Sequence, residues 1–157
     1  MAFFIDGADP PRPALVTGFA DRVERTTAAR CGVVLIVPAF GCATPAVYKA
    51  FDSLSPGPIR EREVREMARS GEPAGAALFN DLSGAAFALH PTLRSLRERV
   101  GRAVGRPVHL TGSGSTLFVV CEPGEARALA DRAARSVAEA AVVATEIVGS
   151  EAGETAP

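Results

Sequence analysis

Residues 107–121 read PVHLTGSGSTLFVVC, in which two short apolar runs flank a loop of small residues. Runs rich in β-branched and aromatic residues and bounded by glycine are typical of strands, so this stretch predicts two strands joined by a short connection. Upstream, residues 32–40 (GVVLIVPAF) form a continuous apolar run that fits a buried strand. Downstream, residues 142–148 (VVATEIV) predict a last strand.

Helical patterns fill the intervals between these strands. Apolar residues at helical spacing predict helices over 44–54, 59–69, 77–89, 91–104 and 125–141. With the helices between the first two strands counted as one crossover, the order is βαββαβ, the split βαβ order of ferredoxin-like folds. The sequence therefore predicts an α+β fold with a four-stranded antiparallel sheet and helices on one face. Residues 14–27 predict two further short strands.

Composition excludes several classes of protein. The 157 residues suit a single domain, and 17 basic against 18 acidic residues give a net charge of −1. That balance argues against a nucleic-acid partner. No apolar run approaches the roughly 18 residues of a membrane span, and the N-terminus does not resemble a signal peptide, so we expect a cytoplasmic protein. Three widely spaced cysteines without a C-x-x-C pair predict neither a metal site nor a disulfide framework.

The small-residue loop Gly112, Ser113, Gly114 and Ser115 is the most suggestive local feature. Glycines let backbone N–H groups approach a ligand closely, and successive N–H groups can bind an anion. The loop is neither a phosphate-binding P-loop nor a dinucleotide fingerprint, since it lacks the lysine of the first and the third glycine of the second. Both a tight strand connection and a ligand contact remain open.

Thr44, Pro45 and Tyr48 form a second candidate. Thr44 is expected to cap a helix that Pro45 opens, and Tyr48 lies four residues after Thr44, on the same helix face. Tyr48 is either a half-buried core aromatic or a flat ring that stacks on a planar base.

The remaining polar residues predict structural roles. The pair Asn80 and Asp81 is expected to cap a helix. His90 and His109 are expected to be a helix-start residue and a sheet residue, because no metal ligand or carboxylate lies near them in sequence. By local chemistry alone, the sequence contains no self-sufficient catalytic constellation.

Four segments, in chain order, resemble one family. They are FFIDG at 3–7, PAFGCATPAVYKAFD at 38–52, FNDLSGAAFALHPTL at 79–93 and HLTGSGSTLFVV at 109–120. Together they resemble the C-terminal half of the 4-diphosphocytidyl-2-C-methyl-D-erythritol kinases, a family within the GHMP kinase superfamily.

This resemblance implies an enzyme that uses ATP and Mg²⁺ to phosphorylate the 2-hydroxyl of a cytidine-diphosphate substrate in the non-mevalonate isoprenoid pathway. It implies two lobes, of which the C-terminal one is ferredoxin-like. Thr44, Pro45 and Tyr48 would line the cytidine pocket. The loop from Gly112 to Ser115 would lie beside the ATP phosphate loop, where the lobes meet.

The resemblance also implies that no catalytic residue lies in this chain. The family's catalytic Asp would fall just before Met1, and its ATP phosphate loop further upstream. We therefore expect an inactive fragment that needs an N-terminal lobe as partner, and a misassigned start or a truncated gene would explain it. The implied domains are 1–30 (remnant strands of the N-terminal lobe), 31–148 (the C-terminal domain) and 149–157 (a disordered tail).

Two other interpretations stay open. The chain could be a free-standing ferredoxin-like module that binds a ligand or forms a homodimer. An excess of exposed apolar surface would count against that alternative. It could also be another GHMP kinase, of the homoserine or mevalonate type, although the Thr-Pro pair and Tyr48 favour a cytidyl substrate.

Overall fold

The computed structural model describes residues 13–19, 21–26, 29–55, 57–71 and 78–148. The FFIDG segment at 3–7 and the tail at 149–157 lie outside the described residues, so the expectations for them stay predictions. The elements are β1 (Ala14–Thr17), β2 (Arg22–Arg25), β3 (Cys31–Pro38), α1 (Thr44–Phe51), α2 (Glu61–Ser70), α3 (Ser83–Leu89), α4 (Pro91–Val104), β4 (His109–Leu110), β5 (Leu117–Cys121), α5 (Ala126–Ala134) and β6 (Ala140–Ile147).

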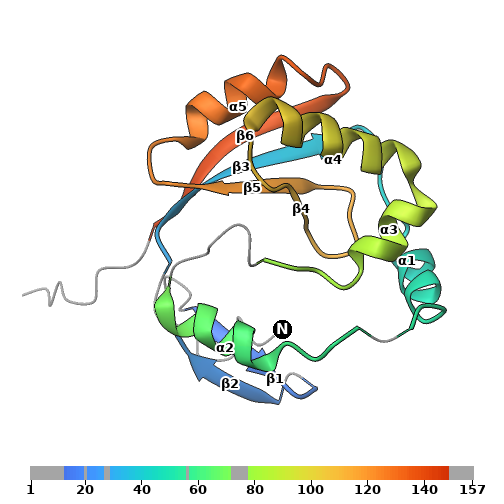
Figure 1. Cartoon of the computed structure of the whole chain (residues 1–157), viewed down its shortest axis with the longest axis vertical. Helices are drawn as coiled ribbons and strands as arrows, with labels where there is room; N and C mark the ends of the chain where they lie inside the picture. Colours follow the sequence, from blue (N-terminus) through green and yellow to red (C-terminus); the bar gives the residue numbers. More distant parts are fainter. Residues whose placement is uncertain (1–12, 20, 27–28, 56, 72–77, 149–157) are drawn as a thin grey trace, which may run out of the picture.

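The main sheet has four strands in the order β4-β5-β3-β6, and all neighbouring strands run antiparallel. Counted from β3, the first strand of the predicted order, this is the spatial order of the split βαβ fold, with the first strand between the third and the fourth. Figure 1 shows α4 and α5 together over one face of this sheet. The predicted α+β fold is thereby confirmed.

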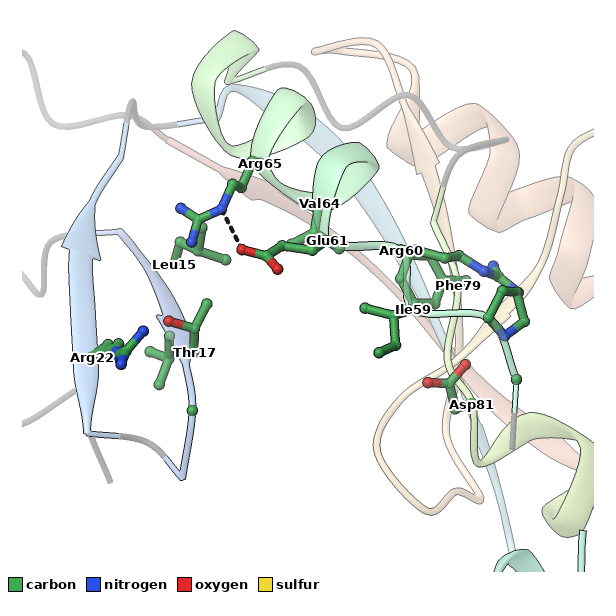
Figure 2. A pocket seen from close by; sticks show the side chains of 14 residues that line it. Leu15, Thr17, Arg22, Ile59, Arg60, Glu61, Val64, Arg65, Phe79 and Asp81 are labelled. Atoms are coloured by element: carbon green, nitrogen blue, oxygen red, sulfur yellow. Dashed lines mark hydrogen bonds and ion pairs between the residues drawn. The ribbon is translucent and has the colours of Figure 1, made fainter. Parts of the chain in front are cut away.

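A second, two-stranded sheet lies away from the first. β1 and β2 pair antiparallel, as residues 14–27 predict, and β1 contacts α2. Arg65 of α2 fastens the hairpin, since its guanidinium donates to Glu24 of β2 at 2.7 Å and to Glu61 at 2.9 Å. These two hydrogen bonds raise the pKa of Arg65 further above its usual range. In Figure 2 the hairpin faces the start of α2 across an open space.

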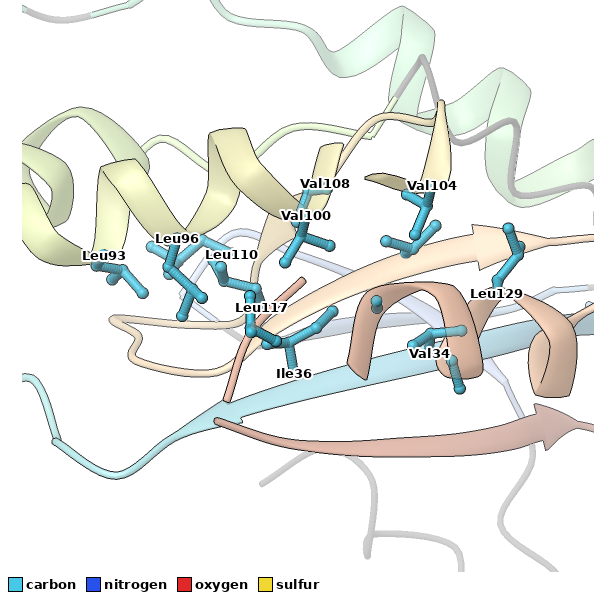
Figure 3. Packing of buried hydrophobic residues seen from close by; sticks show 14 of the residues in the cluster. Val34, Ile36, Leu93, Leu96, Val100, Val104, Val108, Leu110, Leu117 and Leu129 are labelled. Carbon is cyan, nitrogen blue, oxygen red and sulfur yellow. The ribbon is translucent and has the colours of Figure 1, made fainter. Parts of the chain in front are cut away.

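The hydrophobic core lies between the sheet and helices α4 and α5. Strand alternation aims Val34 and Ile36 of β3 and Leu117 of β5 at the helices, and all three are buried. α4 contributes one apolar stripe of four buried residues, Leu93, Leu96, Val100 and Val104. Figure 3 shows these side chains packed in one layer above the strands.

Two predicted helices are much shorter in the structure. The helix predicted over 77–89 begins at Ser83, because Asn80 turns the preceding backbone. The helix predicted over 125–141 ends at Ala134. There the N–H and hydroxyl of Ser136 both donate to the Ala133 carbonyl, and this local bonding competes with a further helical turn.

All three cysteines are reduced, and burial raises the pKa of each thiol. The thiol pKa is then higher in the folded state than in the unfolded chain. The contribution of each thiol to stability is therefore fully present below the usual thiol pKa, about 8.5, and is lost as the pH rises through the folded-state pKa. The urea midpoint should therefore fall between about pH 7.5 and about pH 9.5 in reducing buffer. Cys42→Ala should make that fall smaller, whereas an unchanged wild-type midpoint would contradict the expectation.

Candidate functional site

The loop between β4 and β5 is a compact turn that needs glycine. The N–H of Gly114 donates to the Thr111 carbonyl at 2.9 Å, and Thr111 N–H donates to the Thr116 carbonyl at 3.0 Å. Gly112 and Gly114 have φ angles of +48° and +92°, a region that L side chains rarely enter. The predicted tight connection between two strands is therefore confirmed.

This loop meets the first turn of α1 through hydroxyl groups. The hydroxyl oxygens of Thr44 and Ser113 share a hydrogen bond 2.8 Å long, across 69 positions of sequence. The Ser115 hydroxyl donates to the carbonyl of Phe40. The hydrogen bond between Thr44 and Ser113 thus joins two groups of residues that the sequence singled out separately.

Thr44 does not cap the helix, which corrects the sequence prediction. It is the first residue of α1, and the N-cap, Ala43, makes no side-chain capping bond. The Thr44 hydroxyl is held instead by Ser113. Pro45 is the second residue of α1 and not its first, so it lies in the first turn, one position later than predicted.

Tyr48 lies outside the hydrophobic core. Tyr48 is 52% exposed, whereas its neighbour Val47 is fully buried and provides the contact of α1 with the core. The half exposure agrees with the half-buried aromatic that the sequence predicted, although the ring is not among the buried core residues, and its stacking on a base stays a prediction. The ring stands on the helix whose first residue, Thr44, contacts the loop.

Gly114 brings the loop backbone against the core. A Cβ built on this residue would lie 3.1 Å from Cys42 Sγ, 3.1 Å from Leu110 Cδ1 and 3.5 Å from Leu93 Cδ2. The first two distances are shorter than ordinary van der Waals contact. Burial raises the pKa of the Cys42 thiol, so this neighbour is a neutral thiol at about pH 7.

Asn80 has a role that the sequence did not predict, a bridge to the β4–β5 loop. Its Nδ2 donates to the carbonyls of Leu110 at 2.9 Å and Gly112 at 2.7 Å, and its Oδ1 accepts from Leu82 N–H at 3.0 Å. Asn80 does not cap α3, whose N-cap is Leu82 and has no side-chain capping bond. The Asn-Asp pair was the only signal in the sequence, and it fits a helix cap equally well.

A cavity of about 670 Å³ lies next to this segment, between the β1–β2 hairpin, residues 57–61 and Phe79 (Figure 2). The Arg60 guanidinium carbon lies 4.3 Å from the centroid of the Phe79 ring, a cation–π distance. Asp81 lines the same cavity. The residues that the family resemblance assigns to the cytidine pocket, on α1, and to the lobe junction, in the β4–β5 loop, do not border this space.

The two histidines make ring contacts. The ring centroids of His109 and Phe118 lie 5.3 Å apart, and those of the stacked rings of His90 and Phe40 lie 6.4 Å apart. Across the described ranges, no group of three or more His, Cys, Asp or Glu side chains could hold a metal ion. In that same part of the chain, no helix has the length and apolar character needed to cross a bilayer.

The sequence pattern of the family described as "GHMP kinases C terminal" matches residues 60–139, about half of the chain. The chain belongs to the GHMP kinases. The 4-diphosphocytidyl-2-C-methyl-D-erythritol kinase of Moorella thermoacetica is 34% identical over 122 residues, which cover 72% of this chain and 42% of the relative. The kinase of the same name from Thermus thermophilus is 34% identical over 134 residues, 80% of this chain and 47% of the relative.

A solved structure gives the same family relationship. The crystal structure of a 4-(cytidine 5'-diphospho)-2C-methyl-D-erythritol kinase is similar with a TM-score of 0.68 and 29% identity, over 94% of this chain and 52% of that one. This GHMP kinase chain therefore spans about half the length of the curated relatives it matches. Its fold is that of a GHMP kinase C-terminal lobe.

Proposed function

We propose that this chain is the substrate-binding lobe of a kinase that transfers the γ-phosphoryl group of ATP to the 2-hydroxyl of 4-diphosphocytidyl-2-C-methyl-D-erythritol. The observation that carries the proposal is the hydrogen bond between Thr44 and Ser113. It joins the Thr-Pro-x-x-Tyr helix start, which the family resemblance assigns to the cytidine pocket, to the TGSG loop, which the resemblance places beside the ATP phosphate loop. The names of the two curated relatives support the same substrate.

Each group in this surface has a proposed task. The exposed ring of Tyr48 stacks on the cytosine base, since every base offers a flat face to an aromatic ring. The Thr44 hydroxyl and Pro45 line the same pocket beside it. The loop of Gly112, Ser113, Gly114 and Ser115 lies on the diphosphate side, where the N-terminal lobe would meet it.

Catalysis in this proposal needs a second lobe. Phosphoryl transfer rests mainly on positioning and charge stabilisation. The described residues do not fit a metal site. The family resemblance assigns ATP, Mg²⁺ and the catalytic aspartate to the N-terminal lobe, so we expect no kinase activity from this chain without that lobe.

The exposed apolar residues support a lobe over a free-standing module. Val37 and Val143 are exposed in strands of the main sheet, and Phe19 and Ile59 are almost fully exposed. A module evolved to stand alone is expected to cover such surface. An N-terminal lobe is the partner we propose for it, and a homodimer is the alternative partner.

A titration tests the substrate assignment. Cytidine 5'-diphosphate added to the ¹⁵N-labelled chain should shift the amide signals of Tyr48, Ser113 and Gly114, while adenosine 5'-diphosphate should shift them much less. Equal responses to both nucleotides, or shifts centred on Phe79 and Asp81, would contradict the proposed site.

An activity assay tests the need for a second lobe. The chain with ATP, Mg²⁺ and the 4-diphosphocytidyl substrate should release no ADP above background. Addition of the separately produced N-terminal half of the Thermus thermophilus relative should produce activity. Turnover by the chain alone would overturn the assignment of catalysis to the other lobe.

A further inference from the structure

Asn80 makes an unusual set of hydrogen bonds for a residue between two elements. Its side-chain amide has two donor hydrogens and an acceptor oxygen, and all three functions are used. The hydrogens go to the carbonyls of Leu110 and Gly112, and the oxygen accepts from Leu82. One side chain thus joins the segment before α3 to the end of β4 and to the loop.

The composition makes this residue stand out further. Asn80 is the only asparagine in the 157-residue sequence, which contains no glutamine at all. No other side chain of the protein can therefore donate two amide hydrogens and accept at the adjacent oxygen. The single side-chain amide of the chain lies at the loop that the family resemblance places beside the ATP phosphate loop.

The loop needs an anchor on this side. β4 is only two residues long and forms the edge of the sheet, so pairing with β5 fixes little of the backbone that follows it. Gly112 has a positive φ, and a Cβ built on it would meet no atom within 4 Å. No atom beyond its chain neighbours therefore packs at the Cβ position of Gly112, and the bond from Asn80 holds its carbonyl.

We infer that Asn80 is a positioning residue, which holds the Gly112–Ser115 loop so that Ser113 meets Thr44 at the start of α1. The loop is then held by Asn80 at Leu110 and Gly112, by Thr44 at Ser113 and by the Phe40 carbonyl at Ser115. The role of this geometry in binding the diphosphate rests on the proposed function. The hydrogen bonds that hold the loop do not depend on that proposal.

The same anchor links the loop to the neighbouring cavity. Phe79 and Asp81, on either side of Asn80 in the chain, both line the cavity of Figure 2. A shift of Asn80 would therefore move the cavity wall and the loop together. Asp81 provides a matched control, because it is adjacent and polar but makes none of the three bonds.

The first test uses the wild-type chain. Since Asn80 is the only side-chain amide, its NH₂ group gives one unambiguous pair of signals at a single ¹⁵N shift. Both hydrogens should exchange with water at least about tenfold more slowly than those of a free amide, because both are hydrogen-bonded. Exchange as fast as in free asparagine would overturn the inference without any variant.

The second test uses two variants and the control. Asn80→Asp keeps an acceptor for Leu82 but removes both donors and turns an oxygen toward two carbonyls, and Asn80→Ala removes all three bonds. In both, the backbone order parameters of Gly112 and Ser113 should fall from about 0.85 toward about 0.6, while those of Val34 and Val119 stay unchanged. Asp81→Asn should match the wild type. Rigid loops in both Asn80 variants would overturn the inference.

A third measurement separates positioning from mere folding. Asn80→Asp should weaken binding of cytidine 5'-diphosphate about 5- to 30-fold, as expected for about 1–2 kcal/mol of lost positioning. Binding of cytidine, which lacks phosphates, should change less than about twofold. Equal losses for both ligands would show a merely structural role. If the wild type binds neither cytidine 5'-diphosphate nor cytidine while the loop loosens in the variants, the proposed function fails and the positioning role of Asn80 stands.

Discussion

Replacement of Gly114 by valine is expected to destabilise the protein by about 2–5 kcal/mol and to separate the loop from α1. A left-handed backbone costs an L residue about 1–2 kcal/mol, and excess side-chain volume in a packed site costs about 1–3 kcal/mol more. Gly114 has a φ of +92°, and its absent Cβ would already lie 3.1 Å from Cys42 and from Leu110. The two γ-methyl groups of valine would enlarge the conflict.

Alanine substitutions at Gly112 and Gly114 distinguish backbone strain from crowding of the added side chain. Gly112 also has a positive φ, but nothing lies within 4 Å of its Cβ position. Gly112→Ala should therefore cost about 1–2 kcal/mol from backbone strain alone. Gly114→Ala should cost measurably more, because Cys42 and Leu110 must also move.

Urea unfolding of the three variants gives these differences directly. Loss of the Thr44–Ser113 contact in Gly114→Val would appear as changed amide signals of both residues. Equal midpoints for Gly112→Ala and Gly114→Ala would contradict the close packing at Gly114. In the assembled kinase, an unaffected kcat for Gly114→Val would contradict the place of the loop at the junction of the lobes.

The sheet could be predicted from the sequence because buried strands need runs of apolar residues, and such runs are easy to recognise. The apolar run that contains Val34 and Ile36 is too hydrophobic to face water on both sides, and the runs around Leu117 and Val142 must pair with it. The order of elements then allows few topologies. The ends of helices were predicted less well, because a local bond such as that from Ser136 to Ala133 changes them without changing hydrophobicity.

The site could be predicted only as separate pieces. No local sequence pattern indicates that Thr44 and Ser113 share a hydrogen bond across 69 positions, because each hydroxyl could equally well bond to nearby backbone groups. Asn80 has the same difficulty, because its side chain suits a helix cap as well as a bridge to another loop. The exposure of Tyr48 likewise depends on Val47 filling the core.

Tyr48→Ala should weaken binding of cytidine 5'-diphosphate about 5- to 150-fold, the equivalent of the ~1–3 kcal/mol that a stacked base contributes. The free energy of unfolding should change by less than about 0.5 kcal/mol, because the ring is half exposed and Val47 supplies the core contact. Calorimetric titration and urea unfolding of the same variant measure the two quantities. In the assembled kinase, KM for the cytidyl substrate should rise far more than KM for ATP.

Two neighbouring substitutions identify what the ring contributes. Tyr48→Phe keeps the flat face and should bind the nucleotide nearly as well as the wild type, whereas Lys49→Ala removes a cation one position away and should change the ratio of the two KM values little. An equal rise of both KM values in Tyr48→Ala would place the ring outside the cytidine pocket. A large loss of stability in that variant would instead return Tyr48 to the core, and the exposed ring on α1 could no longer be counted as a ligand contact.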